Sequence, residues 1–346
     1  MSGRAPSPEP GPAPGLARTL ADLTRLAGVS AGTVSRALAG KSNVNPATRE
    51  RIAALAREHG FRPNQVASNL RRRRTGTIDI AIPLGQDRRQ QTSDAFFMTL
   101  LGHLADALTE KGYDLMLRRV IPDRDGDWLD RFIGSGMIDG VLVVGQSDQF
   151  ARIEEVADGY RPMVVWGHHR EGQRHCVVGS DNRLGGKLAA ERLIAWGVRR
   201  LAFLGDRNAI EFAACFAGAA EVARAMGVAV EAFPTHLAPD RMARQVRGHI
   251  AAMAGRFDGI FAATDMLALT CLGELRARGV GVPDEVAVVG FDDLPLARHT
   301  APPLTTVRQD IKAGAWAMVD LLVRRLGGAE TESLIMPPRL VVRDSA

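Results

Sequence analysis

The sequence predicts a small all-α head followed by an α/β body. Two observations indicate this fold class. Between residues 18 and 62, short helical patterns with clear end signals follow one another, and from Ile78 onward apolar runs of strand length alternate with helical stretches. A chain of 346 residues that is 46% hydrophobic is long enough to bury a large core and to form two or three domains.

The head contains three predicted helices. The first begins with the capping-box pattern of Thr19 and Asp22 and stops at Gly28, and the third begins at Asn45-Pro46 and stops at Gly60. The positions expected to face a shared core are Leu20, Leu23, Ala27, Val34, Ala37, Leu38, Ile52, Leu55, Ala56 and Phe61. Two helices joined by the tight turn 28–30 and braced by a third form a helix-turn-helix.

The second helix of the head, within GVSAGTVSRAL (28–38), has an outward face that predicts DNA binding. In a helix-turn-helix, this helix lies in the major groove and presents its N-terminal residues to base edges. Core packing does not require an arginine at position 36, whereas a guanidinium can pair bidentately with guanine. The outward residues are Ala31, Gly32, Thr33, Ser35 and Arg36.

The charge of the chain is concentrated in the head. Residues 18–74 hold 12 Lys and Arg against Asp22, Glu50 and Glu58, a net of +9, whereas the whole chain carries only +5. A merely solvated basic face would spread the charge more evenly. A basic segment on a mildly acidic body is typical of a nucleic-acid-binding head.

The segment NQVASNLRRRR (64–74) joins the head to the body. Asn64 can cap a helix, but the helix-compatible stretch is too short to be stable alone, because helix nucleation is costly. Two interpretations stay open: a plain basic linker, or a segment that folds only on DNA.

The body begins where short apolar runs replace the helical pattern. The runs of strand length include residues 78–82, 138–145, 162–166, 200–205, 259–264 and 285–291. Strands that alternate with helices form parallel sheets covered on both faces, with ligand sites at the carboxyl ends of the strands. Because about ten such units exceed one ordinary doubly wound sheet, we predict two lobes with a cleft between them.

Several function classes find little support in the sequence. No GxGxxG follows a strand, and neither a P-loop nor a nucleophile elbow occurs, so we expect no enzyme activity and no cofactor. The cysteines (Cys176, Cys215, Cys271) lack metal-ligand spacing, and the adjacent His168 and His169 would chelate poorly, so we expect no metal site.

The location of the protein is also predicted from composition. No apolar run approaches the roughly 18 residues of a membrane span. Residues 1–17, rich in Pro, Gly and Ala, lack the apolar core of a signal peptide and are expected to be a disordered leader. We therefore expect a cytoplasmic protein, and a sugar-binding protein without a DNA role is a remote alternative.

From about residue 18 to 344, the sequence resembles the LacI/GalR family of bacterial repressors. The motifs that carry the resemblance occur in order: TLADLTRLAGVSAGTVSRAL, NPATRERIAALAREHGFRPNQVASNLR, RTGTIDIAIP, GSDNRLGGKLAAERLIAWG, ATDMLALTCLGELRARGVGVPDEVAVVGFDD, APPLTTVRQD and PPRLVVRDS. The resemblance implies a body that is an allosteric sensor with a fold like that of periplasmic sugar-binding proteins.

The resemblance also implies the domain boundaries. A helix-turn-helix domain at 18–62 would be followed by a hinge helix and linker at 63–75 and by an effector-binding and dimerisation domain at 76–346. Lobe 1 of that domain is expected at about 76–177 and 306–329, and lobe 2 at about 178–305 and 330–346.

The resemblance assigns DNA-binding roles residue by residue. Leu70 would be a wedge inserted into the central base step, and the alternative for this residue is an apolar anchor on the body. Because Ala31 and Gly32 have no side-chain hydrogen-bonding group, base specificity is expected to rest more on Arg36, Thr33 and the hinge. The expected DNA-binding residues are Thr19, Ser30, Ala31, Gly32, Thr33, Ser35, Arg36, Asn43, Asn45, Asn64, Ala67, Leu70 and Arg71.

The resemblance places the effector between the lobes. For Asp265 a helix N-cap is the favoured alternative to ligand contact, and for Phe97 core packing is equally expected. Cys215 occupies the position of a family arginine that grips effector hydroxyls, so Arg183 or Arg207 takes over, the ligand differs, or sensing has been lost. The expected effector-binding residues are Phe96, Phe97, Cys215, Thr264, Asp265 and Asp292.

The predicted function is that of an effector-controlled, sequence-specific transcriptional regulator. We expect a homodimeric repressor of carbohydrate uptake or catabolism genes, with a pseudo-palindromic DNA operator and a small-molecule effector, a sugar, as partners. A sensor body that responds to a non-sugar ligand, or to none, is the alternative. The chain ends at RDSA without a further leucine heptad, so a dimer is the expected assembly.

Overall fold

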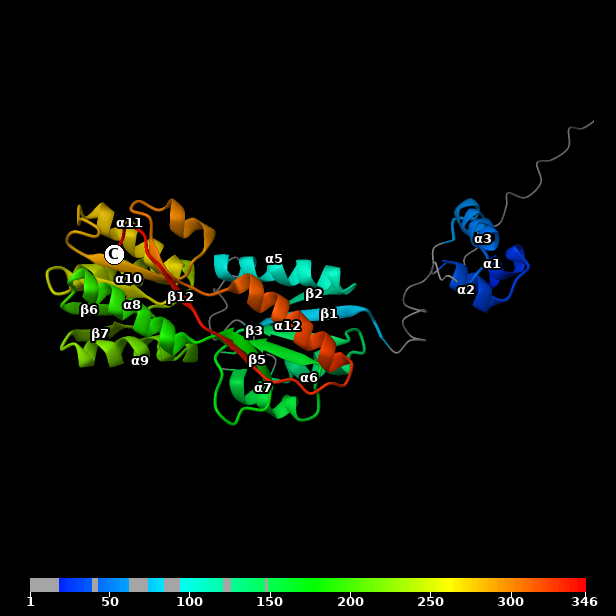
Figure 1. The fold of residues 1–346 in the computed structure, drawn as a ribbon, viewed down its shortest axis with the longest axis horizontal. Helices are drawn as coiled ribbons and strands as arrows, with labels where there is room; N and C mark the ends of the chain where they lie inside the picture. The colour runs from blue at the N-terminus through cyan, green and yellow to red at the C-terminus, as the bar shows by residue number, and fades with distance from the viewer. Residues whose placement is uncertain (1–18, 39–42, 62–73, 84–93, 121–125, 147–148) are drawn as a thin grey trace, which may run out of the picture. The chain divides into compact units, whose positions relative to one another are not determined.

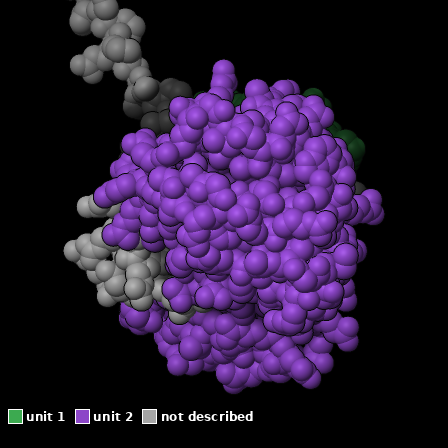
Figure 2. Space-filling model, turned by 90° about the vertical axis from the view of Figure 1, so that its left-hand side faces the viewer, with its two compact units in different colours: residues 1–74 green, residues 75–346 purple. Residues whose placement is uncertain are grey.

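The computed structural model describes residues 19–38, 43–61, 74–83, 94–120, 126–146 and 149–346. The chain divides into two compact units, residues 1–74 and 75–346, which are coloured separately in Figure 2. No helix in the described part of the chain is long and apolar enough to cross a membrane. The predicted leader (1–17) and most of the predicted hinge lie outside the described residues.

The first unit contains the predicted helix-turn-helix, formed by α1 (Leu20–Ala27), α2 (Ala31–Leu38) and α3 (Pro46–Glu58). The capping box is present, because Thr19 Oγ1 accepts from the Asp22 N–H at 3.2 Å and Asp22 Oδ2 accepts from the Thr19 N–H at 3.1 Å. Gly28 ends α1 in the left-handed conformation that glycine adopts without strain. The three helices share one core of Leu23, Ala27, Val34, Ala37, Val44, Ile52, Ala56 and Phe61.

The second unit contains two six-stranded sheets (Figure 1). The first sheet has the order β11-β5-β4-β3-β1-β2 and is parallel throughout: β1 (Thr77–Pro83), β2 (Asp114–Val120), β3 (Gly140–Val144), β4 (Met163–Trp166), β5 (Cys176–Ser180) and β11 (Leu334–Met336). We call this sheet and its helices lobe 1. The predicted pattern of parallel strands alternating with helices is confirmed.

The second sheet has the order β12-β10-β9-β8-β6-β7 and defines lobe 2. Its strands are β6 (Arg200–Leu204), β7 (Ala229–Phe233), β8 (Gly259–Ala262), β9 (Ala287–Asp292), β10 (Thr305–Arg308) and β12 (Arg339–Val341). All pairs are parallel except β10 with β12.

Helices cover both faces of the sheet in lobe 1 (Figure 1). The pair α5 (Ala95–Glu110) and α12 (Ile311–Leu326) packs on one face over Ile78 and Ile80 of β1, and α6 (Trp128–Gly134) and α7 (Phe150–Ala157) pack on the other over Val141 and Val143 of β3. The period of two along the strands sends successive side chains to opposite faces. Because helices bury both faces of the sheet, the side chains on both faces must be apolar, and the strands are continuous apolar runs in the sequence.

Lobe 2 is covered by two helix pairs. These are α8 (Asn182–Trp196) with α9 (Ile210–Ala225), and α10 (Pro239–Met253) with α11 (Asp265–Ala277), and a short 3-10 helix, η2 (Pro295–His299), follows β9. Helices α8 and α9 approach closely, because a Cβ on Gly186 or Gly218 would overlap backbone of the facing helix. The middle of α9 is thereby held against the first half of α8.

Three of the expected lobe boundaries are corrected by strand pairing. β5 continues in lobe 1 to Ser180, β10 pairs with β9 and so keeps residues 305–308 in lobe 2, and β11 pairs with β5 and so places residues 334–336 in lobe 1. The chain therefore crosses between the lobes at about residues 181, 309 and 337. Local sequence does not encode which sheet a short apolar strand joins, because both sheets offer the same kind of edge.

Candidate functional site

Helix α2 divides its residues between the core of the head and the surface. Val34 is 0% exposed and Ala37 is buried, whereas Ala31, Gly32 and Arg36 are exposed. Thr33 and Ser35 are half-buried. The structure therefore presents the outward residues that the sequence predicts on one surface.

The guanidinium of Arg36 extends over the N-terminal tip of α2. A Cβ added to Gly32 would lie 3.8 Å from Arg36 Nη2, so the guanidinium rests above this glycine. Ser30 Oγ accepts from the Thr33 N–H at 3.2 Å and caps the helix at the same end. The arginine therefore stands at the helix end that bears on bases in this motif.

The other expected DNA-binding residues of the head lie at helix starts. Thr19 caps α1, and Asn45 caps α3 by accepting from the Ala47 N–H at 2.9 Å. Both residues and Asn43 are exposed. The expected hinge residues Asn64, Ala67, Leu70 and Arg71 lie outside the described residues.

In the second unit, a cavity is lined by residues from both lobes at the carboxyl ends of their strands. Five of the expected effector-binding residues, Phe96, Phe97, Cys215, Thr264 and Asp292, line it. The described lining also includes polar and aromatic side chains that the sequence analysis did not select: Asp94, Trp166, Ser180, Asn182, Glu211, Phe212, Phe291 and Gln309.

Aromatic rings form the lobe 1 wall of the cavity. The ring centroid of Phe96 lies 5.8 Å from that of Phe97 and 5.8 Å from that of Trp166. Phe96 and Phe97 also pack against the core of lobe 1. The two roles weighed for Phe97, core packing and a ring facing the ligand space, therefore coexist.

The expectations for Asp265 are wrong. This residue is fully buried outside the cavity lining, where its two carboxyl oxygens accept from Thr306 Oγ1 at 2.6 Å and from the Leu294 N–H at 2.7 Å. The N-cap of α11 is Thr264, whose Oγ1 accepts from the Leu267 N–H at 3.2 Å. Burial raises the pKa of Asp265 to about 7. Its carboxyl links β10 to the segment that follows β9. Local sequence cannot predict this role, because both partners are distant along the chain.

Asp292 is aimed into the cavity by an unusual backbone turn at the end of β9. Asp292 and Asp293 both have positive φ, at 121° and 56°, a conformation that non-glycine residues hold only when their surroundings enforce it. Asp293 is anchored by Arg343 and by Arg308, whose Nε lies 2.6 Å from Asp293 Oδ2. The strained turn therefore has two ion pairs that hold it.

The Asp292 carboxyl lacks a full set of partners. The side chain is buried at 4% exposure, and its Oδ1 accepts from Gln309 Nε2 at 2.6 Å. Its Oδ2 has no hydrogen-bond partner among the described residues. Burial, with smaller contributions from the carboxyls of Asp265 and Asp94, raises the pKa of Asp292 well above its ordinary value.

Two further carboxyls line the same cavity. Asp94 caps α5 by accepting from the Phe96 N–H at 2.9 Å, and Glu211 lies in the first turn of α9. Burial raises the pKa of both. The cap signal before the aromatic pair could have identified Asp94, but no local pattern distinguishes Glu211 from a surface residue.

Cys215 lines the cavity with a buried thiol, and all three cysteines are free and buried. Burial raises the pKa of this thiol well above its ordinary value. The two substitute donors considered for this position are corrected: Arg183 pairs with Glu221 at 2.6 Å, Arg207 lies over the Phe216 ring at 4.7 Å, and neither lines the cavity.

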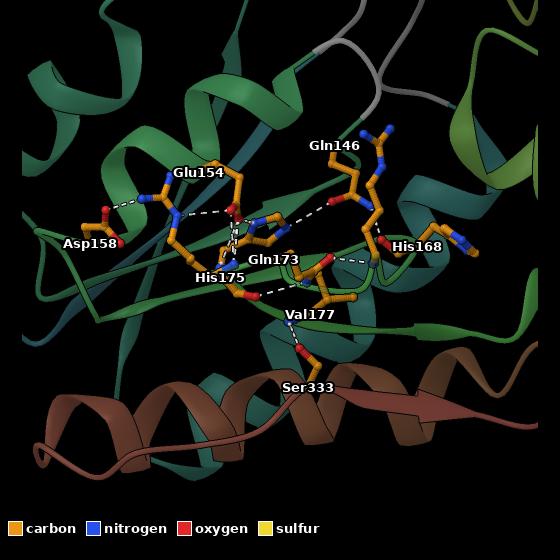
Figure 3. Close-up of polar contacts among 10 residues, drawn as sticks. Gln146, Glu154, Asp158, His168, Gln173, His175, Val177 and Ser333 are labelled. Carbon is orange, nitrogen blue, oxygen red and sulfur yellow. Dashed lines mark hydrogen bonds and ion pairs between the residues drawn. The ribbon is translucent and has the colours of Figure 1, made fainter.

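A polar network behind the cavity holds the segment that follows β4 (Figure 3). Gln146 donates through Nε2 to the His168 carbonyl, and its Oε1 lies 3.1 Å from His175 Nε2. The other ring nitrogen of His175 contacts Glu154 on α7. A Cβ on Gly167 would overlap Gln146, so this contact requires glycine there.

Glu154 also accepts backbone N–H groups from the segment that leads into β5. It takes the N–H groups of Arg174 at 3.0 Å and His175 at 3.1 Å. Gln173 closes the turn between them, accepting from the Arg170 N–H at 2.7 Å and donating to the His175 carbonyl at 3.0 Å (Figure 3). The network therefore fixes the loop between β4 and β5.

A metal centre is not apparent in the part of the chain that the structure describes. No group of three or more His, Cys, Asp or Glu there could hold a metal ion.

Comparison with known proteins identifies relatives for both units. Residues 19–64 match the family described as bacterial regulatory proteins, lacI family, and residues 190–346 match a periplasmic binding protein-like domain. The HTH-type transcriptional regulator CelR of Thermobifida fusca is 32% identical over 340 residues, covering 94% of this chain and 98% of CelR.

Solved structures extend the likeness to the fold. A complex of the transcriptional regulator CelR with cellobiose has a TM-score of 0.69 at 30% identity and matches over 95% of this chain and 99% of its own. The lac repressor dimer bound to operator and the anti-inducer ONPF has a TM-score of 0.82 over 94% of this chain and 98% of its own. Its identity is 22%, so this second likeness concerns the fold alone.

Proposed function

Since this chain belongs to the LacI family of bacterial regulatory proteins, we propose that it represses genes of carbohydrate uptake or catabolism under the control of a small-molecule effector. The protein is a transcriptional regulator with a DNA-binding helix-turn-helix head. We further propose that it acts in the cytoplasm as a homodimer on a pseudo-palindromic operator, one head on each half-site. The CelR relative and the CelR–cellobiose complex support the carbohydrate class.

The observation that carries the DNA-binding part is the division of α2 into a buried and an exposed face. Val34 and Ala37 fix the helix in the head, which leaves Thr33 and Arg36 free to meet base edges. Thr19, Ser30, Asn43 and Asn45 stand where helix starts can approach phosphates, and Ala31 and Gly32 allow close backbone approach. The hinge residues Asn64, Ala67, Leu70 and Arg71 are proposed to contact the minor groove and the backbone.

The effector part rests on a cavity whose lining comes from two lobes. A ligand there contacts Phe96 and Phe97 of lobe 1 together with Cys215, Thr264 and Asp292 of lobe 2. Such a ligand binds one arrangement of the two lobes more tightly than another. It can change the occupancy of the DNA only to the extent of this difference in affinity between the two arrangements. We propose binding without catalysis, because the Cys215 thiol has a raised pKa and no histidine occurs among the described lining residues.

The test of DNA binding uses the full chain. Sites are selected from genomic fragments, and the dissociation constant of the best site is measured by fluorescence anisotropy across a salt series. Specific binding should weaken steeply with salt, because arginine contacts to phosphate release counterions. Failure to find a specific site, or an affinity independent of salt, contradicts the proposed function.

Arg36→Ala tests the recognition helix. The variant should lose about 5- to 150-fold in specific affinity, since a bidentate arginine–guanine contact is worth about 1–3 kcal/mol. Arg276→Ala, an exposed arginine on α11, removes the same charge from the body and should change the affinity by less than about twofold. Equal losses in both variants would mean that charge alone, and not α2, determines binding.

A further inference from the structure

The cavity between the lobes is acidic. Three carboxyls line it, from Asp94, Glu211 and Asp292, and its described lining includes no lysine, arginine or histidine. The three side chains belong to three different segments of the chain, one from lobe 1 and two from lobe 2. Their convergence is therefore a property of the tertiary structure.

The partners given to these carboxyls are neutral donors. Asp94 accepts the backbone N–H of Phe96, and Asp292 accepts from the side-chain amide of Gln309. Asp292 Oδ2, on a side chain only 4% exposed, has no partner in the described part of the structure. A buried carboxyl with an unpaired oxygen, on a residue that lines the cavity, calls for a donor from the ligand.

Among the described residues, the arginines near the cavity are engaged elsewhere. Arg308 and Arg343 both pair with Asp293, and Arg183 pairs with Glu221. Arg170 exerts an attractive electrostatic effect on Glu211, but its guanidinium lies 4.1 Å from the centre of the Phe150 ring, outside the cavity lining. An arginine in place of Cys215 would supply a positive charge to compensate the carboxylates, whereas a buried thiol supplies none.

We propose that the effector carries a positively charged amino group, as an amino sugar does, and that its ammonium binds between Asp292 and Glu211. This inference rests on the proposed function and narrows its effector class. An ammonium supplies three N–H donors and the missing positive charge, so it forms charge-assisted hydrogen bonds with the carboxylates. The rings of Phe96, Phe97 and Trp166 in the same lining add cation–π attraction.

The acidic lining also sets what the cavity rejects. A neutral sugar can form a hydroxyl hydrogen bond with Asp292, but it brings no positive charge to favour the ionised form of carboxyls whose pKa values burial raises. A phosphorylated or uronic sugar would bring a like charge into a buried acidic site, which is strongly unfavourable.

The test compares sugars that differ in a single group. Binding of the full chain is measured by isothermal titration calorimetry for two series: glucose, glucosamine and N-acetylglucosamine; and cellobiose, the β-1,4 glucosamine dimer and its N,N′-diacetylated form. In at least one series the amino sugar should bind about tenfold or more tighter than the hydroxyl and acetamido forms, because a charge-assisted bond is about twice as strong as a neutral one.

Two variants locate the charge contact. Glu211→Gln, which removes charge at nearly constant shape, should abolish most of the preference for the amine over the hydroxyl sugar. Glu221→Gln removes a carboxylate outside the cavity and should leave the preference intact. Equal affinity for amine and hydroxyl forms, no binding of any of the six sugars, or an amine preference that survives Glu211→Gln overturns the inference.

The proposed function is judged separately, by the DNA measurement. If cellobiose binds and weakens operator affinity while the amino sugars bind no more tightly than the hydroxyl sugars, the proposed function is supported and the amino-group inference fails. If no specific DNA site exists, the proposed function fails even where the calorimetry shows an amine preference.

Discussion

The DNA-binding head and the ligand cavity of the body arrange their functional side chains in opposite ways. In the head, one helix of eight residues holds both the buried anchors, Val34 and Ala37, and the exposed Thr33 and Arg36. In the cavity, the three carboxyls stand at positions 94, 211 and 292, on segments that meet only in the folded lobes. A function carried by one helix face follows from local periodicity, whereas a convergent site depends on topology.

The largest expected effect is a loss of stability of the head, and it tests whether the head is stabilised by its own hydrophobic core. Leu23, which is 0% exposed, packs in the single small core cluster of the head. Leu23→Ala should lower the free energy of unfolding of the head by about 2–5 kcal/mol, because it removes buried methyl groups and leaves a cavity. Specific DNA affinity then falls with the folded fraction of heads, and hydrogen exchange over residues 19–61 should accelerate.

Leu26→Ala is the matched control for this core substitution. Leu26 lies on the same helix but is 46% exposed, so its truncation should change the stability of the head by less than about 0.5 kcal/mol. Sugar binding to the body should be the same in both variants and in the wild type. Loss of sugar binding in Leu23→Ala would show that the two units do not fold separately.

The next effect, on the body, concerns the pH dependence of its stability. Burial on β1 raises the pKa of Asp79 to about 6, despite the ion pair with Arg118 at 3.1 Å. Between pH 3.8 and about 6 the folded chain therefore binds more protons at this site than the unfolded chain. The contribution of Asp79 to stability is greatest below this window and is lost as pH rises through it, by about 3 kcal/mol.

Asp79→Asn isolates this contribution. Urea unfolding of the body at a series of pH values should show a decline between pH 4 and 6 that is smaller in Asp79→Asn than in the wild type by about 2 kcal/mol. Asp106→Asn, which changes an exposed aspartate on α5, should keep the wild-type pH dependence. Identical curves for wild type and Asp79→Asn would mean that the Asp79 pKa is not raised in the folded chain.

The smallest of the three effects is a loss of stability of the body. It compares a carboxylate that contacts a distant segment of the chain with a neighbouring carboxylate that forms only a surface ion pair. Glu154→Ala removes the acceptor for two backbone N–H groups and leaves one ring nitrogen of the buried His175 without a partner. The expected loss of stability is about 1–3 kcal/mol, the usual penalty for a buried polar group left unsatisfied. Glu155→Ala, its exposed neighbour, loses only a surface pair with Arg152 and should cost less than about 1 kcal/mol.

Chemical unfolding of the two variants compares them directly. If Glu155→Ala destabilises the body as much as Glu154→Ala, the network of Figure 3 contributes no more than a surface ion pair.

The sequence by itself determined the elements whose causes are local. Thr19 with Asp22, Gly28 and Asn45-Pro46 predict the limits of the head helices, because capping and left-handed backbone are properties of a few adjacent residues. The apolar runs predict the strands of the body within a few residues, because burial on both faces requires continuous hydrophobicity. The exposed face of α2 followed from the same local period.

Only the tertiary structure decided how distant segments combine. It placed β11 beside β5 and brought Glu211 and Asp94 to the same cavity as Asp292. It also showed that Asp265, expected at the ligand site, is buried and hydrogen-bonded within lobe 2. Apart from the cap signal at Asp94, these outcomes have no local signal, because a carboxylate looks the same in sequence whether it braces a core or faces a ligand. What distinguishes them is the set of neighbours, and long-range strand pairing selects that set.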